Sequence, residues 1–334
     1  MRPILKWPGG KAKMARLIHD AFGDERPEGY VEPFAGGLAC FFHLEQSSAF
    51  TGLQRAPILS DACGSLMLSY SVLQTRPDDL VAVLQKMTAG HTEPRAWTRD
   101  YYRIRAAFNA FRAIALKPVA AGRGAYLPDS DAGVKHAAQM LWVNRACFNG
   151  LWRTNRSGGF NASAGSYKTV KLDYPAMRMA GETFRRYATD LRWCDWRVSL
   201  SEARDGDWVF VDSPYLPLDS QANSFTGYSA IRPWGAQEHR ELAFQCCLAA
   251  RRGAKVVLTN HDSTLTHKIY ARENGWEVYA RPTLTRTISQ SAQRMKATEV
   301  VLVLEPGRVQ LPNNPNTQLS MLGDAPVALE DLHV

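Results

Sequence analysis

The chain has 334 residues, of which 45% are hydrophobic and 22% are charged, a composition that excludes global disorder, collagen and a bundle of membrane helices. Its 40 Lys and Arg outnumber its 32 Asp and Glu, and the net charge of +8 is compatible with a polyanionic partner without requiring one. Because the chain is about twice the usual domain length, we expect one large domain or a core with an insert.

Short apolar strands alternate with helices in the first part of the chain. We expect a strand at 30–34, a helix over 38–44 and a strand at 58–61, and both strands run into Gly, Asp or other turn residues. This pattern is typical of an α/β sheet whose carboxyl edge binds a ligand. The six cysteines are scattered, so neither a metal site nor a disulfide scaffold is predicted.

The basic charge is concentrated between residues 95 and 192. This segment holds 17 Lys and Arg against 6 Asp and Glu, whereas the rest of the chain holds 23 against 26. Apolar residues recur at helical spacing from Tyr101 to Phe111, a second apolar helix is expected around Met140, and a Gly-rich turn at 155–160 favours a hairpin. Positive charge on a helical segment marks it as the part that would face a polyanion.

The last elements return to the strand pattern. We expect strands at 208–212, 255–260, 276–280 and 299–304, with the last two forming an antiparallel edge. A tail rich in Pro, Asn and Gln follows, for which we expect an extended, weakly ordered chain. The predicted division is an α/β core at 1–63 and 176–305, a helical insert with a hairpin at 64–175, and the tail at 306–334.

No targeting or membrane segment is predicted. The N-terminal residues lack the apolar run of a signal peptide, and no stretch reaches the length of about 18 apolar residues that a spanning helix needs. We therefore expect a cytoplasmic protein, associated with the nucleoid if it binds DNA.

Two predicted strand ends carry groups suited to binding a nucleoside. The segment from Glu32 to Gly37 places two glycines between a strand and a helix, where the backbone can approach a ligand closely. Asp61 ends the next strand, where an acidic residue hydrogen-bonds ribose hydroxyls in nucleoside-binding α/β folds. The six-position dinucleotide fingerprint is absent, so a nucleoside without a pyrophosphate fits equally well.

The tetrapeptide Asp212-Ser213-Pro214-Tyr215 follows another predicted strand. A carboxylate and a backbone carbonyl that accept both hydrogens of an exocyclic amine would aim its lone pair at a methyl donor, with the aromatic ring stacked on the base. An ordinary Asp-Ser-Pro turn has the same composition, so the tetrapeptide alone leaves both interpretations open.

Together these segments resemble, in order and to about residue 305, the Dam-type (D12 class) DNA adenine-N6 methyltransferases. The resemblance implies a Rossmann-like class I methyltransferase fold with a helical recognition insert, S-adenosylmethionine as the cofactor without a metal, and double-stranded DNA as the partner. The implied cofactor residues come from a motif at residues 5–11, the glycine loop at 32–37, Asp61 and an acid–aromatic pair at 195–196. They are Trp7, Gly10, Lys11, Glu32, Pro33, Phe34, Ala35, Gly36, Gly37, Asp61, Asp195 and Trp196.

The segment 144–153, continuing to Phe160 and Asn161, is similar to the DNA-recognition hairpin of that family. We expect Arg153 to contact guanine, because Arg matches the O6 and N7 acceptors bidentately. Asn149 and Leu151 are candidates for base-edge or intercalating roles, whereas Trp142 and Trp152 are interpreted as packing residues. Phosphate contacts, which give affinity without sequence information, are expected from Arg145, Arg156 and Lys168.

The implied reaction is direct methyl transfer to a flipped adenine. Tyr215 stacks on the base, while Asp212 and the Ser213 carbonyl accept the amino hydrogens; no covalent enzyme intermediate is implied. Because methyl transfer from a sulfonium to a poised amine needs no histidine, His261 is interpreted as structural.

The sequence departs from the family pattern at two positions. Ser213 stands where the catalytic tetrapeptide usually has a second proline, and Ser163 stands where the hairpin usually has one; the segment 123–135 has no counterpart. Because of Ser213, a DNA-binding homologue with impaired catalysis is kept as an alternative. Cytosine-N4 methylation, which uses the same amine chemistry, is another, although Asp212 favours adenine, and structured RNA as substrate is a third. We expect a monomer, with a dimer on DNA as the alternative. Restriction–modification, housekeeping and phage-borne settings fit the sequence equally well.

Overall fold

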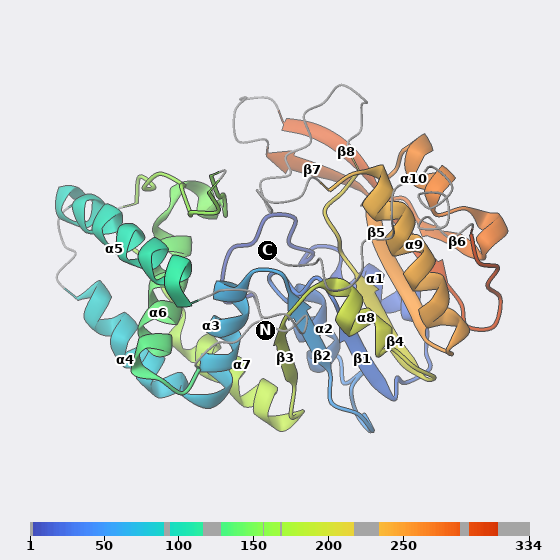
Figure 1. The fold of residues 1–334 in the computed structure, drawn as a ribbon, viewed down its shortest axis with the longest axis horizontal. Coiled ribbons are helices and arrows are strands. Elements are labelled where there is room, and N and C mark those ends of the chain that lie inside the picture. The colour runs from blue at the N-terminus through green and yellow to red at the C-terminus, as the bar shows by residue number, and fades with distance from the viewer. Residues whose placement is uncertain are drawn as a thin grey trace.

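The computed structural model describes residues 3–89, 94–115, 128–155, 157–167, 169–216, 234–287 and 294–312. Its centre is an eight-stranded sheet with the order β3-β2-β1-β4-β5-β8-β6, in which β7 also pairs with β8 (Figure 1). The strands are β1 (Gly29–Glu32), β2 (Ile58–Asp61), β3 (Asp190–Trp193), β4 (Asp207–Val211), β5 (Lys255–His261), β6 (Trp276–Ala280), β7 (Thr283–Thr287) and β8 (Arg294–Leu304).

Parallel pairing joins β3, β2, β1, β4 and β5, whereas β8 runs antiparallel to β5, β6 and β7. The order of the five parallel strands is that of a Rossmann-like doubly wound sheet, and it confirms the predicted fold class. The order reverses between β1 and β4, and ligands of such sheets bind outside the carboxyl ends of the strands at that point.

Helices cover both faces of the sheet. They are α1 (Ala15–Phe22), α2 (Ala39–Gln46), α3 (Gly64–Thr75), α4 (Pro77–Thr88), α5 (Pro94–Ala115), α6 (Asp131–Ala146), α7 (Tyr174–Arg186), α8 (Trp196–Ser201), α9 (Ala236–Arg251) and α10 (Thr264–Ile269), with short 3-10 turns η1 (Phe148–Gly150) and η2 (Arg272–Asn274). In β4, Trp208 and Phe210 join the cluster of α1, α2 and α3, whereas Val209 and Val211 join that of α8 and α9. This alternation follows from the two-residue period of a strand.

The helices α4, α5 and α6 lie at one end of the molecule, whereas β6, α9 and α10 lie toward the other (Figure 1). The helices α4 and α6 contact α3, which also contacts α7, β2 and β3. Their buried side chains form one continuous apolar cluster with a face of the sheet. The division into core and insert stays a prediction; the boundary drawn at 175–176 falls within α7.

The predicted strands at 58–61, 208–212, 255–260 and 276–280 are confirmed to within one residue. The first predicted strand runs too far, because β1 ends at Glu32 and residues 33 and 34 belong to the following loop. The strand β8 begins five residues before the predicted position, and β3 and β7 were missed. In β3, Arg192 interrupts the apolar pattern, since its buried guanidinium is paired with Asp190 and Glu202.

The expected tail lies mostly outside the described residues, which end at 312. No helix in the described part of the chain is long and apolar enough to cross a membrane.

Candidate functional site

The carboxyl ends of β1, β2, β4 and β5 meet at one edge of the sheet, because all four strands are parallel. Glu32 and Asp61 are the last residues of β1 and β2, and Asp212 follows β4 directly. Three carboxyl groups that lie far apart in the sequence are thereby collected at the edge where the order of the strands reverses.

Asp212 is held by two groups from opposite ends of the chain. The Lys11 Nζ atom lies 2.8 Å from Asp212 Oδ1, and the Thr259 hydroxyl donates to the same oxygen at 2.9 Å. Burial raises the pKa of Asp212, whereas Lys11 and the Thr259 hydrogen bond oppose that rise. Since both contacts are made to Oδ1, Oδ2 is left as an acceptor for another group.

The ring of Tyr215 lies beside this ion pair. Lys11 Nζ is 4.9 Å from the ring centroid, and the His261 ring meets Tyr215 edge-on at 4.9 Å. The Tyr215 hydroxyl donates to Glu299 Oε2 at 2.7 Å, and burial raises the pKa of Tyr215, so this hydroxyl stays protonated. The ring is thus anchored from β8, and Lys11 connects it with the carboxylate.

The glycine loop after β1 is closed onto Asp61. The Gly36 N–H donates to Asp61 Oδ2 at 3.0 Å, Asp61 Oδ1 accepts from the Cys63 N–H at 2.8 Å, and the Tyr70 hydroxyl donates to the Gly36 carbonyl at 2.6 Å. Gly36 has a φ of 45°, and a Cβ atom added there would lie 2.8 Å from Trp7 Cδ1. Only glycine therefore fits beneath the indole of Trp7.

Glu32 is turned into the core below this loop. Its side chain is 2% exposed and accepts a 2.7 Å hydrogen bond from the Tyr30 hydroxyl. Burial raises the pKa of Glu32 to about 8, and this is larger than the opposing effect of Tyr30. The Glu32 carboxyl group is therefore mostly neutral at pH 7 and supports the loop from beneath.

The expected acid–aromatic pair lies at the start of α8. Asp195 caps this helix by accepting from the Arg197 N–H at 2.9 Å, and its carboxylate is also paired with the Arg197 guanidinium. The Trp196 ring stacks near Phe34 of the glycine loop, with 6.1 Å between the ring centroids. This stack joins two expected cofactor segments that are separated by more than 150 residues.

The expected recognition hairpin packs against the N-terminal motif. The indoles of Trp7 and Trp152 stack at 5.4 Å, and Trp152 stacks in turn on Phe160 at 4.8 Å. Trp142 and Trp152 are buried, as the packing interpretation predicts. The Lys6 backbone bonds to the Asn144 side chain through both its N–H and its carbonyl.

The expected DNA-contacting side chains have different surroundings. Asn149 is exposed and has a φ of 54°, and Leu151 is half-buried. Arg153 is exposed, and its Nε donates to Asn161 Oδ1 at 2.8 Å. The Arg145 guanidinium donates to the Ile4 carbonyl at 2.8 Å, so it ties α6 to the N-terminal segment. Two further candidates lie outside the described residues: Arg156 and Lys168.

Three residues that contact the tetrapeptide have no role predicted from the sequence. Thr259 and Glu299 lie only within predicted strands, and His239 has no predicted role. Each sits in an ordinary strand or helix pattern, and only the order of the strands brings it to the tetrapeptide. Glycine spacing and acids at strand ends, in contrast, are local signals.

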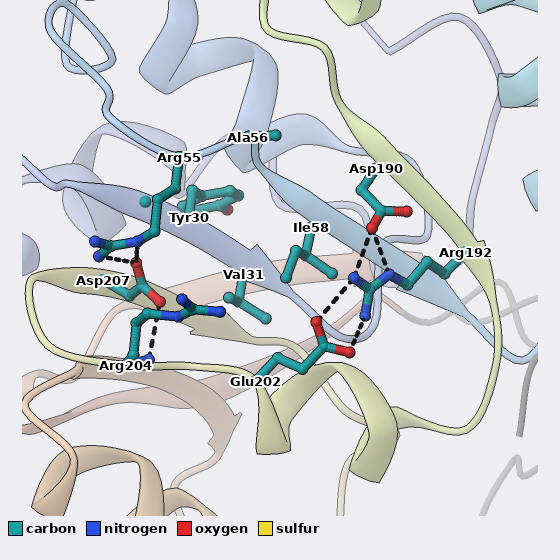
Figure 2. A pocket seen from close by; sticks show the side chains of 11 residues that line it. Tyr30, Val31, Arg55, Ala56, Ile58, Asp190, Arg192, Glu202, Arg204 and Asp207 are labelled. Carbon is teal, nitrogen blue, oxygen red and sulfur yellow. Dashed lines mark hydrogen bonds and ion pairs between the residues drawn. The ribbon is translucent and has the colours of Figure 1, made fainter.

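A cavity opens at the opposite, amino edge of the strands (Figure 2). Arg192 on its wall is bonded to both Asp190 and Glu202, and Arg55 is bonded to Asp207. Asp207 begins β4, whereas Asp212 follows the end of that strand. The cavity is therefore separate from the edge that carries Asp212. The charged side chains named on its wall are paired with one another.

Comparison with known proteins shows which family the chain belongs to. Residues 7–284 match the model of the D12 class N6 adenine-specific DNA methyltransferases. The Type II methyltransferase M1.LlaDCHI of Lactococcus lactis subsp. cremoris is 28% identical over 306 residues, which cover 90% of this chain and 95% of that protein. The Type II methyltransferase M.MjaIII of Methanocaldococcus jannaschii is 29% identical over 289 residues (84% and 92%). The DNA adenine methylase of Escherichia coli K12 is 27% identical over 311 residues (92% and 97%). The chain therefore belongs to the D12 class of N6 adenine-specific DNA methyltransferases.

Proposed function

We propose that the protein methylates the N6 amine of an adenine that has been flipped out of double-stranded DNA, with Asp212, the Ser213 carbonyl and Tyr215 at the reacting centre. S-adenosylmethionine, when bound, supplies an electrophilic methyl group on a sulfonium. The protein's task is then to bring the amine to that methyl group with its lone pair aimed correctly. Flipping is required because an amine within a base-paired duplex cannot reach a carboxylate at the edge of the sheet.

The observation that carries this proposal is the state of the Asp212 carboxylate. Lys11 and Thr259 both contact Oδ1, and the ammonium group favours the ionised acid in surroundings that otherwise raise its pKa. The ionised Oδ2 accepts one amino hydrogen and the Ser213 carbonyl accepts the other. This pair of acceptors counters delocalisation of the nitrogen lone pair into the ring.

Tyr215 supplies the stacking surface for the flipped base. Because its hydroxyl is tied to Glu299, the ring has little freedom to rotate away from the base. A stacking contact of a base on an aromatic ring contributes about 1–3 kcal/mol. Lys11 approaches both Asp212 and Tyr215, so it helps to position both parts of the reacting centre.

The residues around the glycine loop fit a nucleoside cofactor without a pyrophosphate. Asp61 uses one oxygen for Gly36 and the other for Cys63, and a carboxylate has about four lone-pair sites, which leaves capacity for ribose hydroxyls. Phe34 and Trp196 offer an aromatic wall for an adenine ring. Trp7, Gly10, Pro33, Ala35, Gly37 and Asp195 complete the proposed cofactor site.

The hairpin of the insert is the proposed recognition element. Arg153 is exposed next to the stack formed by Trp7, Trp152 and Phe160, which gives the hairpin a rigid base. In this proposal Arg153 contacts a guanine, Asn149 and Leu151 contact bases or insert between them, and Arg145, Arg156 and Lys168 contribute positive charge toward phosphates. The protein acts as a monomer, which sedimentation with and without duplex DNA would test.

The central experiment follows transfer of a labelled methyl group to unmethylated duplex DNA, with hydrolysis of the product to distinguish N6-methyladenine from N4-methylcytosine. We expect N6-methyladenine, and loss of activity by about 1,000-fold in Asp212→Asn, since one preorganised acceptor is removed. Asp78→Asn is the matched control, because Asp78 is an exposed acid of α4. Full activity in Asp212→Asn would refute the mechanism, and transfer to structured RNA in preference to DNA would refute the substrate.

A further inference from the structure

A stripe of polar side chains lies on the face of α5 that meets the recognition hairpin. Tyr101, Arg105, Asn109 and Arg112 follow one another at intervals of four, four and three residues, which places them on one side of the helix. All four side chains bond to the backbone of the hairpin segment 158–162. The stripe is therefore a built contact between α5 and the hairpin.

Asn109 makes the central contact with both ends of its amide. Its Nδ2 donates to the Phe160 carbonyl at 3.0 Å, and its Oδ1 accepts from the Phe160 N–H at 2.9 Å. Phe160 is 1% exposed, so its backbone groups need partners within the protein. A neighbouring antiparallel strand would satisfy the N–H and the carbonyl of one residue in the same way.

The flanking contacts are made to the carbonyls two residues away on either side. Arg112 donates to the Gly158 carbonyl, whereas the Tyr101 hydroxyl and Arg105 Nη1 each donate to the Ala162 carbonyl at 2.8 Å. Four residues of a helix span about 6 Å and two residues of a strand span about 6.6 Å. Side chains at this helical spacing therefore match alternate residues of an extended segment, and the stripe takes the place of a third strand beside the hairpin.

The other edge of the segment faces the arm of the hairpin that contains Arg153. The Asn155 N–H donates to the Gly159 carbonyl at 2.8 Å, and the Asn161 N–H donates to the Arg153 carbonyl at 3.0 Å. Asn161 also holds the Arg153 side chain, since its Oδ1 accepts from Nε at 2.8 Å and its carbonyl accepts from Nη2 at 3.3 Å. A guanidinium has five N–H donors, which leaves capacity for the O6 and N7 acceptors of guanine.

We propose that Asn109 is a positioning residue for base recognition, which holds Phe160 so that the next residue, Asn161, presents the Arg153 guanidinium to guanine. The inference rests on the proposed guanine contact of Arg153. The residues on both sides of Asn161 are bonded to α5, so Asn161 cannot shift without breaking those bonds. Because Asn161 holds both the backbone and the guanidinium of Arg153, a shift of Asn161 would move the group that reads the base.

The test measures discrimination, which is the ratio of kcat/KM for a duplex with the recognised site to kcat/KM for the same duplex with a guanine of that site replaced. Sequencing of DNA methylated by the unaltered protein first identifies the site, and each guanine is then replaced in turn. Arg153→Ala should lower discrimination at one guanine by about 10- to 100-fold and Asn109→Ala by about tenfold, because a misplaced guanidinium loses the bidentate geometry. The matched control is Asn274→Ala, which removes an amide that donates to the Gln310 carbonyl far from the hairpin and should leave discrimination unchanged.

A double-mutant cycle separates this positioning role from a purely structural one. If Asn109 acts through Arg153, Asn109→Ala in the Arg153→Ala background should lower discrimination by less than about twofold. An equal loss in both backgrounds, or unchanged discrimination in Asn109→Ala alone, would overturn the inference. If Asn109→Ala fails to fold, Asn109→Asp replaces it with the same expected outcomes, since this change keeps the acceptor for the Phe160 N–H and removes the donor to the Phe160 carbonyl.

The parent variant shows which proposal has failed. If Arg153→Ala left discrimination unchanged at every guanine, the proposed guanine contact would be wrong, and the role of Asn109 with it. If Arg153→Ala lowered discrimination and Asn109→Ala did not, only the role of Asn109 would be wrong. The methylation chemistry is tested independently of both through Asp212→Asn.

Discussion

His136 makes the stability of the protein depend on pH in a calculable way. The imidazole is 1% exposed, stacked between Phe108 at 4.6 Å and Phe111 at 4.4 Å, and bonded through Nε2 to the Ser65 hydroxyl. Its Nδ1 atom has no partner among the described residues, so a second proton would be buried without an acceptor. Burial, with a smaller effect of the nearby Arg112 charge, lowers the pKa of His136 from 6.5 to about 3.

The folded state therefore binds this proton more weakly than the unfolded state. The stabilising contribution is fully present above pH 6.5 and is lost progressively as the pH falls from 6.5 towards 3. At 1.36 kcal/mol per pH unit, the loss at pH 5 is about 2 kcal/mol. Because α3, α5 and α6 share one apolar cluster with the sheet, we expect the loss to appear in the unfolding of the whole structure.

The assay is urea unfolding at pH 5, 6, 7 and 8, followed by tryptophan fluorescence. The perturbation is the pair His136→Phe and Ser65→Ala, which retains an aromatic ring and removes the hydroxyl that would otherwise lose its partner. We expect the free energy of unfolding of the unaltered protein to fall by about 2 kcal/mol more than that of the variant between pH 8 and pH 5. Parallel pH profiles for the two proteins would refute the reasoning.

Three further predictions concern the hairpin and the reacting centre. Gly150→Ala should destabilise the protein by about 1–3 kcal/mol in urea unfolding, because the added Cβ would lie 2.2 Å from Lys6 Cδ at a φ of 65°. Gly158→Ala is the control for backbone strain alone, since Gly158 has a φ of 76° and open space around it. Equal losses of stability in the two variants would exclude the clash. Arg153→Ala should relax specificity at one base pair by about 1–3 kcal/mol, which sequencing of the methylated sites would measure. The control is Arg178→Ala, which removes an exposed arginine paired with Asp78 and should leave the methylated sites unchanged. If Arg153→Ala also left them unchanged, Arg153 would not be the guanine contact. In Lys11→Met, the acid limb of the plot of kcat/KM against pH should move to higher pH, because the pKa of Asp212 rises further when its cation is removed. An acid limb that did not move would mean that Asp212 does not need to be ionised.

The sequence alone determined the fold class and the position of three acids at the ends of strands. Glu32, Asp61 and Asp212 each end or follow an apolar strand, and parallel strands bring their carboxyl ends to one edge. Strand runs and glycine pairs are local signals, so a single sequence reveals them. The concentration of positive charge between residues 95 and 192 was equally visible, because it needs only counting.

Only the tertiary structure decided what holds these groups in place. Glu299 reaches Tyr215 because β8 inserts antiparallel beside β5, and His239 reaches Pro214 because α9 packs over the face of the sheet that contains Val209 and Val211. Similarly, the stack of Trp7 on Trp152 joins the N-terminal motif to the hairpin. A buried residue in a helix or strand has the same local pattern whether it only packs or also donates a hydrogen bond, so its partner is defined only when the order of strands and helices is known.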